Sequence, residues 1–272
     1  MKVSFLSTIV IIVTSCSLIH FGVFNPPSKE ETLSNSSYNW QKDSTVHFNY
    51  YYESNSICAN YIDSTKIYME KNFSELLEFL GIQRYKNKLN LFMVDSREKM
   101  KEIIGVETNG ISNFEDNTVY SIFNDNIKTY GKHEFCHVIT CNEWGMYQEI
   151  WLSEGLAVNS DNNWWDHDLH SLANYLKVKG KLIPLKDIVE NFYKYDNLIV
   201  YPECGSFVKY IKEKYGLDII KELWKVGSTA FENRLGKNIT EIEKDWLQEI
   251  SKYDYAKIDY EEKVFQMFIK KL

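Results

Sequence analysis

The sequence lacks an excess of positive charge. Its 31 Lys and Arg residues are outnumbered by 38 Asp and Glu residues, which gives a formal net charge of −7 at pH 7. A protein that binds nucleic acid needs a basic face that neutralises phosphates, so we expect no nucleic-acid partner. Apolar residues are not in excess either, because 44% of the chain is hydrophobic and the mean hydropathy is −0.37. These values are typical of a soluble globule.

One mostly apolar run stands at the N-terminus, where Lys2 precedes residues 3–13. A basic residue, an apolar centre and small residues describe a secretory signal. Val13-Thr14-Ser15-Cys16 also resembles the bacterial lipobox, in which the Cys is acylated, although Leu is the usual first residue. Apolar residues continue to Phe24, far enough for an uncleaved membrane anchor. All three interpretations of residues 1–24 predict an extracytoplasmic protein, attached to a bacterial cell membrane or secreted. A buried first helix of a cytosolic protein is the remaining alternative.

The rest of the chain divides into three parts. Residues 25–44 are polar and lack an apolar period, which predicts a tether. Residues 45–251 are numerous enough to bury a core and predict one domain with two lobes, at about 45–144 and 145–251. Residues 252–272 predict a helical tail with an apolar side, which would dock onto the domain or lie on a membrane.

The periodicity of apolar residues predicts an α+β fold, with a small sheet followed by a mainly helical part. Alternating β-formers indicate strands, and apolar residues three and four apart indicate helices. The predicted strands are residues 45–52, 89–94 and 118–123, and the predicted helices are residues 56–80, 96–104, 200–215, 218–226 and 238–250.

The strongest chemical signal is the pattern HEFCH at residues 133–137. His133 and His137 are four residues apart, so on a helix they present two imidazoles to one point. That arrangement suits one zinc ion per chain. Glu134 lies further round the helix, where its carboxylate can act as general base on a water in the open position of the metal.

A catalytic zinc ion needs a third protein ligand, and Glu154 is the candidate. It lies in the apolar segment WLSEGLA, where a carboxylate would otherwise be costly to bury. Asp161 follows at i+7 on the same helical face and is predicted to accept the second N–H of a ligand histidine. The alternative for Asp161 is a polar helix end.

The helix that carries HEFCH is predicted to begin near Ile127 and to end before Gly145. Phe135 points away from the ligands and should anchor this helix in the core. Cys136 lies on its flank. We expect Cys136 to be a small buried hydrophobe, because a fourth protein ligand would close the position that the water needs.

Residues 162–170 read NNWWDHDLH and offer a second, weaker constellation. His167 and His170 stand among aspartates, but nothing completes a ligand set, so we expect a solvated loop. Trp164 and Trp165 are expected to pack between the lobes, with a place in a substrate pocket as the alternative.

Cysteine is scarce, with five residues in the chain. If Cys16 is acylated, three pairings remain open among the others, Cys58, Cys136, Cys141 and Cys204. We expect free and mostly buried thiols, although a bridge to Cys204 is an alternative outside the cell.

HEFCH followed by WLSEGLA resembles the gluzincin zinc peptidases, and more narrowly the small bacterial peptidase-MA-like domains. Their third ligand stands in a W-L-x-E-G-[FL]-A segment. Two later segments are also similar: Tyr201 followed four residues on by Gly205, and residues 235–247 from Leu-Gly to Trp-Leu. The resemblance covers about residues 45–251 and implies a sheet lobe and a helical lobe with zinc between them. It further implies that an edge strand, sought here in residues 109–123, holds an extended peptide.

The function implied is hydrolysis of a peptide or protein substrate by an endopeptidase, with Tyr201 as a second donor to the oxyanion. An aminopeptidase is disfavoured, because residues 110–113 do not reproduce the G-x-M-E-N segment of gluzincin aminopeptidases. Two alternatives come from other classes. One is a membrane-anchored zinc-binding or interaction protein without turnover, and the other is a structural tethered protein without metal.

Overall fold

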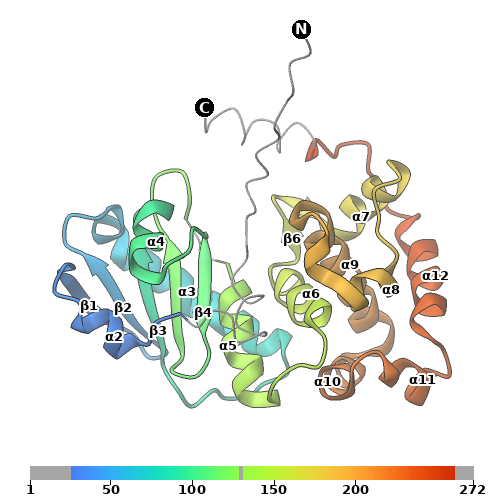
Figure 1. Ribbon diagram of the computed structural model, residues 1–272, viewed down its shortest axis with the longest axis horizontal. Helices are drawn as coiled ribbons and strands as arrows, with labels where there is room; N and C mark the ends of the chain where they lie inside the picture. Colours follow the sequence, from blue (N-terminus) through green and yellow to red (C-terminus); the bar gives the residue numbers. More distant parts are fainter. Residues whose placement is uncertain (1–25, 129–130, 261–272) are drawn as a thin grey trace, which may run out of the picture.

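The computed structural model describes residues 26–128 and 131–260. These residues form a mixed α+β fold in which the main sheet, with helices before and between its strands, comes first and a mainly helical part follows. Figure 1 shows the sheet and its covering helices on one side, a group of helices on the other, and helix α5 (His133–Trp144) between them. The predicted order of a small sheet followed by a helical part is therefore confirmed.

The main sheet has five strands in the order β1-β2-β3-β5-β4. They are β1 (Trp40–Ser44), β2 (Phe48–Glu53), β3 (Leu89–Val94), β4 (Gly110–Asn113) and β5 (Thr118–Ile122). Strands β2, β3 and β5 are parallel, whereas β1 and β4 pair antiparallel at the two edges. Strands β3 and β5 lie where they are predicted. Strand β2 begins at Phe48, because the N–H of Thr45 binds the carbonyl of Phe48 and residues 45–47 turn.

Alternating side chains of the parallel strands cover two different core clusters, as the period of two in a strand requires. Leu91 and Val119 join the cluster under helix α3 (Ile57–Phe79). Phe92 and Tyr120 face the other way, toward helix α4 (Arg97–Ile104). Both helices lie where the sequence predicts them.

The predicted tether is wrong for residues 26–44, because this segment is folded onto the sheet. Asn113 donates from Nδ2 to the carbonyl of Pro26 at 2.9 Å, and the Tyr120 hydroxyl donates to Pro27 at 2.9 Å. Helix α2 (Lys29–Ser34) follows, with a capping box at its start and Thr32 buried. Local sequence patterns cannot predict these hydrogen bonds, because the bonded residues lie some 90 positions apart in the chain.

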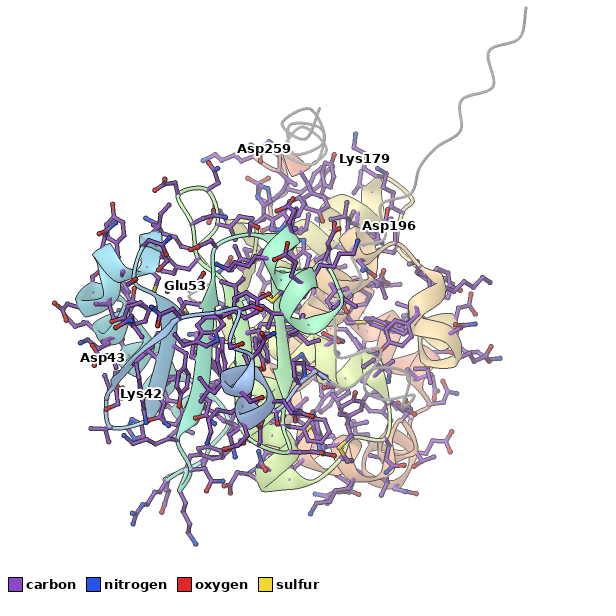
Figure 2. The ribbon with its side chains drawn as sticks, turned by 60° about the vertical axis from the view of Figure 1, so that its left-hand side comes forward. Lys42, Asp43, Glu53, Lys179, Asp196 and Asp259 are labelled. Atoms are coloured by element: carbon purple, nitrogen blue, oxygen red, sulfur yellow. The ribbon has the colours of Figure 1, made fainter. Side chains whose placement is uncertain are left out.

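Strand β1 also lies within the predicted tether. It is an edge strand whose outer residues are polar, and Lys42 and Asp43 lie at the rim of the molecule in Figure 2. Asp43 pairs with Lys66 at 2.7 Å, while Trp40 packs edge-on against Phe92 with ring centroids 5.1 Å apart. Charged residues on an edge strand discourage pairing with other chains, and they also remove the apolar alternation that identifies a strand in a sequence.

The second lobe is built from helices around α6 and α9. Its elements are α6 (Ile150–Asp161), the hairpin β6 (Asn163–Trp164) and β7 (His167–Asp168), α7 (Leu169–Val178), α8 (Leu185–Asn191), the short 3-10 helix η1 (Phe192–Lys194), α9 (Asn197–Tyr215), α10 (Leu217–Val226), α11 (Thr229–Leu235) and α12 (Ile239–Ile250). The helices predicted near 200–215, 218–226 and 238–250 are confirmed in type and place. A single apolar cluster runs from Phe48 in the sheet through Leu152 in α6 to Trp246 in α12, so the two lobes share one core.

Several predictions fall on residues outside the described part. They are the signal, lipid or anchor interpretation of residues 1–24, including Cys16, and most of the predicted C-terminal tail. In residues 26–128 and 131–260, no helix has the length and apolar character needed to cross a membrane.

The docking of residues 26–44 can be tested by truncation. Deleting residues 1–44 should lower the melting temperature relative to deleting residues 1–25, because β1 and the buried Thr32 are lost. At about 1 kcal/mol for each hydrogen bond lost, the cost is about 3 kcal/mol or more. That corresponds to a drop of about 6 °C or more in a protein of this size. Calorimetry of both proteins measures the difference. Equal melting temperatures would show that residues 26–44 do not stabilise the domain, as a tether would not.

Candidate metal centre

Helix α5 begins at His133 and not near Ile127, so the predicted start of this helix is wrong. Asn124 Oδ1 accepts the N–H of Ile127 at 2.7 Å, which folds residues 124–127 into a turn. At the true start, Asp161 Oδ1 accepts the N–H of Lys132 at 2.7 Å. A carboxylate at this position satisfies a free N–H of the first turn and interacts favourably with the helix dipole.

Helices α5 and α6 bring His133, His137 and Glu154 together. Nε2 of His133 lies 3.3 Å from Glu154 Oε2, and Nε2 of His137 lies 3.5 Å from the same oxygen. The two Nε2 atoms are 3.2 Å apart. Within the described chain this is the one group of three or more His, Cys, Asp or Glu side chains whose ligand atoms converge, all within 4.8 Å. The predicted convergence on a single point is confirmed.

The three side chains are shielded from solvent to different degrees. Glu154 is 0% exposed and His137 is 2% exposed, whereas His133 keeps 21% of its side-chain surface and opens the group on one side. Burial alone would raise the pKa of Glu154, but the two imidazoles lower it to about 2. Burial alone would lower the pKa of His133, but Glu154 and Glu134 raise it to about 9.

A buried carboxylate beside two imidazole nitrogens is costly unless a positive charge accompanies it. Two neutral imidazoles and one carboxylate are also the donor set of a three-ligand divalent site. The donor atoms are on one face, and the exposed side of His133 leaves an approach to them. The residues present therefore fit a divalent metal ion.

The orientation of His137 is set by a residue that the sequence analysis missed. Ser153 Oγ lies 3.1 Å from His137 Nδ1 and is buried with it. Partners of this kind fix the ring and the tautomer of a metal-binding histidine. Asp161, the predicted partner of a ligand ring, binds the backbone at the start of α5 instead. Ser153 occupies the variable position of the W-L-x-E-G motif, so the motif does not predict its contact with His137.

Glu134 projects from the first turn of α5 toward the edge strand β4. A Cβ added at Gly110 would lie 2.9 Å from Glu134 Oε1, so the strand approaches the carboxylate closely only because residue 110 is glycine. Burial raises the pKa of Glu134, while His133 and His137 act to lower it and Ser112 provides a hydrogen bond. Within the described chain its Oε2 is buried and has no hydrogen-bond partner. The carboxylate thus lies beside the histidines without joining the group of ligand atoms.

Tyr201 reaches the same region from helix α9. Its ring centroid is 6.4 Å from that of His133, and the side chain is almost wholly buried. Pro202 follows inside the helix, which begins at Asn197. Proline cannot donate to the carbonyl of Leu198, and the Tyr260 hydroxyl donates to that carbonyl at 2.6 Å instead. The helix therefore continues through Tyr201 and Pro202, because the carbonyl that lacks its helical donor accepts a hydrogen bond from Tyr260 instead.

Helices α6 and α9 cross at two glycines. A Cβ at Gly155 would lie 2.6 Å from the carbonyl oxygen of Cys204, and one at Gly205 would lie 2.5 Å from a methyl of Val158. Neither contact is compatible with a real side chain, so the close crossing requires glycine on both helices. This crossing holds Glu154 of α6 and Tyr201 of α9 in a fixed relation.

A cavity of about 660 Å³ opens beside the group. His133, Glu134 and Tyr201 line it, together with Gly110 at the start of β4 and Asn109 just before that strand. Further lining residues come from the second lobe: Val158, Asp161, Asn163, Trp164, Trp165, Asp166, Asn197 and Leu198. The cavity lies between an edge strand and a row of aromatic rings. Trp164 and Trp165 line this cavity and also pack against buried side chains, so the structure is compatible with both interpretations of this pair.

The remaining candidates do not join the metal centre. Phe135 and Cys136 are buried as predicted, and none of the four cysteines of the described chain is in a disulfide. His167 pairs with Asp259 at 3.0 Å. His170 is wholly buried, with Nδ1 2.8 Å from Ser206 Oγ. The prediction of a solvated loop at residues 162–170 is therefore wrong for both histidines, although neither belongs to a converging group of ligands.

No protein-family model matches the chain, and no curated protein matches it.

Metal analysis tests the centre directly. Purified protein dialysed against zinc should retain one ion per chain by mass spectrometry. His137→Ala and Glu154→Gln should each weaken binding more than about 100-fold, and Ser153→Ala about 10-fold to 100-fold, in line with losses seen for partners of ligand histidines. His47→Ala, a histidine paired with Glu70 away from the site, is the control and should bind as the natural chain does. Equal zinc retention by all four variants would contradict the assignment.

The helix crossing gives a second prediction. Gly155→Ala should lower the free energy of unfolding by about 1–3 kcal/mol, the usual cost of overpacking. It should also weaken zinc binding, because Glu154 moves with its helix. Gly236→Ala is the control: nothing lies within 4 Å of an added Cβ, although its φ of +62° adds backbone strain. It should lose stability, measured by denaturant titration, without losing zinc affinity. Unchanged zinc affinity in Gly155→Ala would show that the crossing does not position the carboxylate.

Proposed function

We propose that the chain is a zinc-dependent peptidase, most simply an endopeptidase, with a fold like that of the gluzincins. The observation that carries the proposal is the convergence of His133, His137 and Glu154 within 4.8 Å, with Glu134 beside them on one cavity. The α+β architecture, with a sheet lobe and a helical lobe on either side of α5, is compatible with the arrangement that the motifs imply.

Zinc is the proposed metal because two imidazoles and a carboxylate are a common catalytic zinc set. When bound, zinc would polarise the scissile carbonyl and acidify a water molecule. His133, His137 and Glu154 would hold it. Ser153 would keep the ring of His137 in place through its hydrogen bond at 3.1 Å.

Glu134 is the proposed general base. Its carboxylate lies in the first turn of α5, between the two histidines and strand β4, and borders the cavity. A carboxylate is a common general base where it lies close to the water that it activates. In the proposed reaction Glu134 takes a proton from the attacking water and gives it to the leaving amine. Tyr201, which lines the same cavity near His133, would donate its phenolic O–H to the developing charge on the carbonyl oxygen.

The substrate is proposed to be an extended peptide along β4. This strand is the outermost on its side of the sheet and runs antiparallel to β5, next to α5. An edge strand binds extended peptides through main-chain hydrogen bonds without regard to sequence. Residues 110–113 are Gly-Ile-Ser-Asn and provide no glutamate to hold a free amino terminus, which favours an endopeptidase over an aminopeptidase.

The proposal includes attachment to a membrane from outside the cytoplasm, through an acylated Cys16 or an apolar anchor in residues 1–24. A zinc-binding or interaction protein without turnover is the second candidate function. The intact base beside the ligands, with its buried oxygen, favours the enzyme.

Glu134→Gln tests the mechanism. The variant should bind zinc as the natural chain does, because Glu134 is outside the ligand group, but cleavage of a peptide library should fall by several orders of magnitude. Glu143→Gln, an exposed residue on the same helix, is the control and should cleave normally. Mass spectrometry of the digests measures both.

Three outcomes separate the candidates. Cleavage by Glu134→Gln at the normal rate would remove Glu134 from the mechanism. A zinc-loaded natural chain that cleaves nothing would favour the binding protein. Peptides with free and with acetylated amino termini distinguish the two peptidase classes, because an aminopeptidase cannot act on the acetylated form.

A further inference from the structure

The hairpin of β6 and β7 places a tryptophan in an unfavourable backbone conformation. Trp165 and Asp166 form its two-residue turn, with φ values of 53° and 66°. Turns with both central residues at positive φ are usually made by Asn, Asp and Gly. A residue with a bulky side chain is a clear outlier there, and the left-handed conformation costs about 1–2 kcal/mol. Strain of this kind persists only where surrounding contacts hold it, and it is frequent at binding sites.

Contacts on both sides hold the hairpin in place. Trp164 donates from Nε1 to the Tyr260 hydroxyl at 2.9 Å, and His167 pairs with Asp259 at 3.0 Å. Asn163 donates to the carbonyl of Asp161, the last residue of α6, at 2.8 Å. Asp259 lies at the margin of the molecule in Figure 2, so the hairpin is braced from its outer side.

The hairpin extends a row of aromatic rings that starts at the metal centre. The Tyr201 ring stacks on Trp164, with centroids 5.9 Å apart and planes at 25°. Trp164 stacks on Trp165, with centroids 6.1 Å apart and planes at 11°. Because Tyr201 is also 6.4 Å from His133, the row leads outward from the ligands. We call Tyr201, Trp164 and Trp165 the aromatic row.

All three members of the aromatic row line the 660 Å³ cavity, as do Gly110 of β4 and Asn109 just before it. Trp164 and Trp165 are half-buried and line the cavity, so they are not fully covered by the rest of the protein. Offset stacking between aromatic rings at centroid distances of about 4.5–7 Å contributes about 0.5–1.5 kcal/mol beyond burial. A further ring could therefore continue the row.

We propose that the aromatic row is the specificity subsite of this cavity and selects a substrate with an aromatic or large aliphatic side chain beside the scissile bond. The inference rests on the proposed peptidase function. A peptide extended along β4 points alternate side chains to opposite sides, and those on the cavity side meet the row. The strained turn has a use in this arrangement, because it places the Trp165 ring at the outer end of the row.

The test compares acetylated peptides that are identical except for Phe, Leu, Ala or Asp on either side of the cut. The natural zinc-loaded chain should cleave the Phe and Leu peptides at least about tenfold faster, as kcat/KM, than the Ala peptide. Trp165→Asn removes the ring and places a residue that tolerates positive φ. It should lose most of that preference and keep its rate on the Ala peptide within about twofold. Trp165→Phe should restore part of the preference.

Asp166→Asn is the matched control, because it changes the other residue of the same turn and leaves the ring. It should keep the apolar preference. If it alone alters selection, charge and not the aromatic row decides specificity, and the inference is overturned. Cleavage without apolar preference, or preference unchanged in Trp165→Asn, also overturns it while leaving the peptidase function intact.

Binding to Glu134→Gln separates the two proposals. Fluorescence anisotropy of labelled peptides should give tighter binding of Phe than of Ala, by about tenfold, and Trp165→Asn in the same background should remove the difference. If the natural chain cleaves nothing but this difference in binding is found, the peptidase function fails and the subsite stands. If neither cleavage nor the difference in binding is found, both fail.

Discussion

The structure depends on one buried carboxylate held between two imidazoles. Glu154 has no exposed surface, and its oxygen lies within 3.5 Å of Nε2 of both His133 and His137. Such a charge is stable in a protein interior only with a compensating partner. The surrounding helices are arranged around this requirement: glycines let α6 approach α9, Ser153 orients one ring, and Asp161 fixes the start of α5. A divalent ion with an open approach is the partner that this geometry favours, and the peptidase proposal follows from it.

The sequence predicts well whatever depends on neighbours along the chain. Spacing on one helix places His133 beside His137, and an unlikely buried Glu154 identifies the third member of the group. Strong apolar runs give strands β3 and β5 and the long helices α3, α9 and α12. These features are local, so periodicity and helix geometry are sufficient to find them.

The predictions that fail depend on distant partners. Residues 26–44 look like a tether because they are polar, yet their carbonyls and Thr32 are bound by residues of β4 and β5 far along the chain. The start of α5 is misplaced because an asparagine turn precedes it and a carboxylate of α6 caps it. The aromatic row is visible in sequence only as two adjacent tryptophans, since Tyr201 comes from helix α9, some 36 residues further along the chain.

The bond from Tyr260 to Leu198 has a consequence for biosynthesis. Pro202 leaves the Leu198 carbonyl without its helical donor, and the hydroxyl that satisfies it belongs to a residue near the end of the described chain. The same hydroxyl accepts from Trp164, so one phenol joins α9 to the hairpin. A ribosome adds Tyr260 after His133, Glu134, His137 and Glu154, and domains fold as their sequence emerges. A nascent chain therefore carries these four side chains before Tyr260 can brace the hairpin and the start of α9. The hairpin and the proline-interrupted start of α9 therefore acquire this shared bond only after helices α10, α11 and α12 have been synthesised.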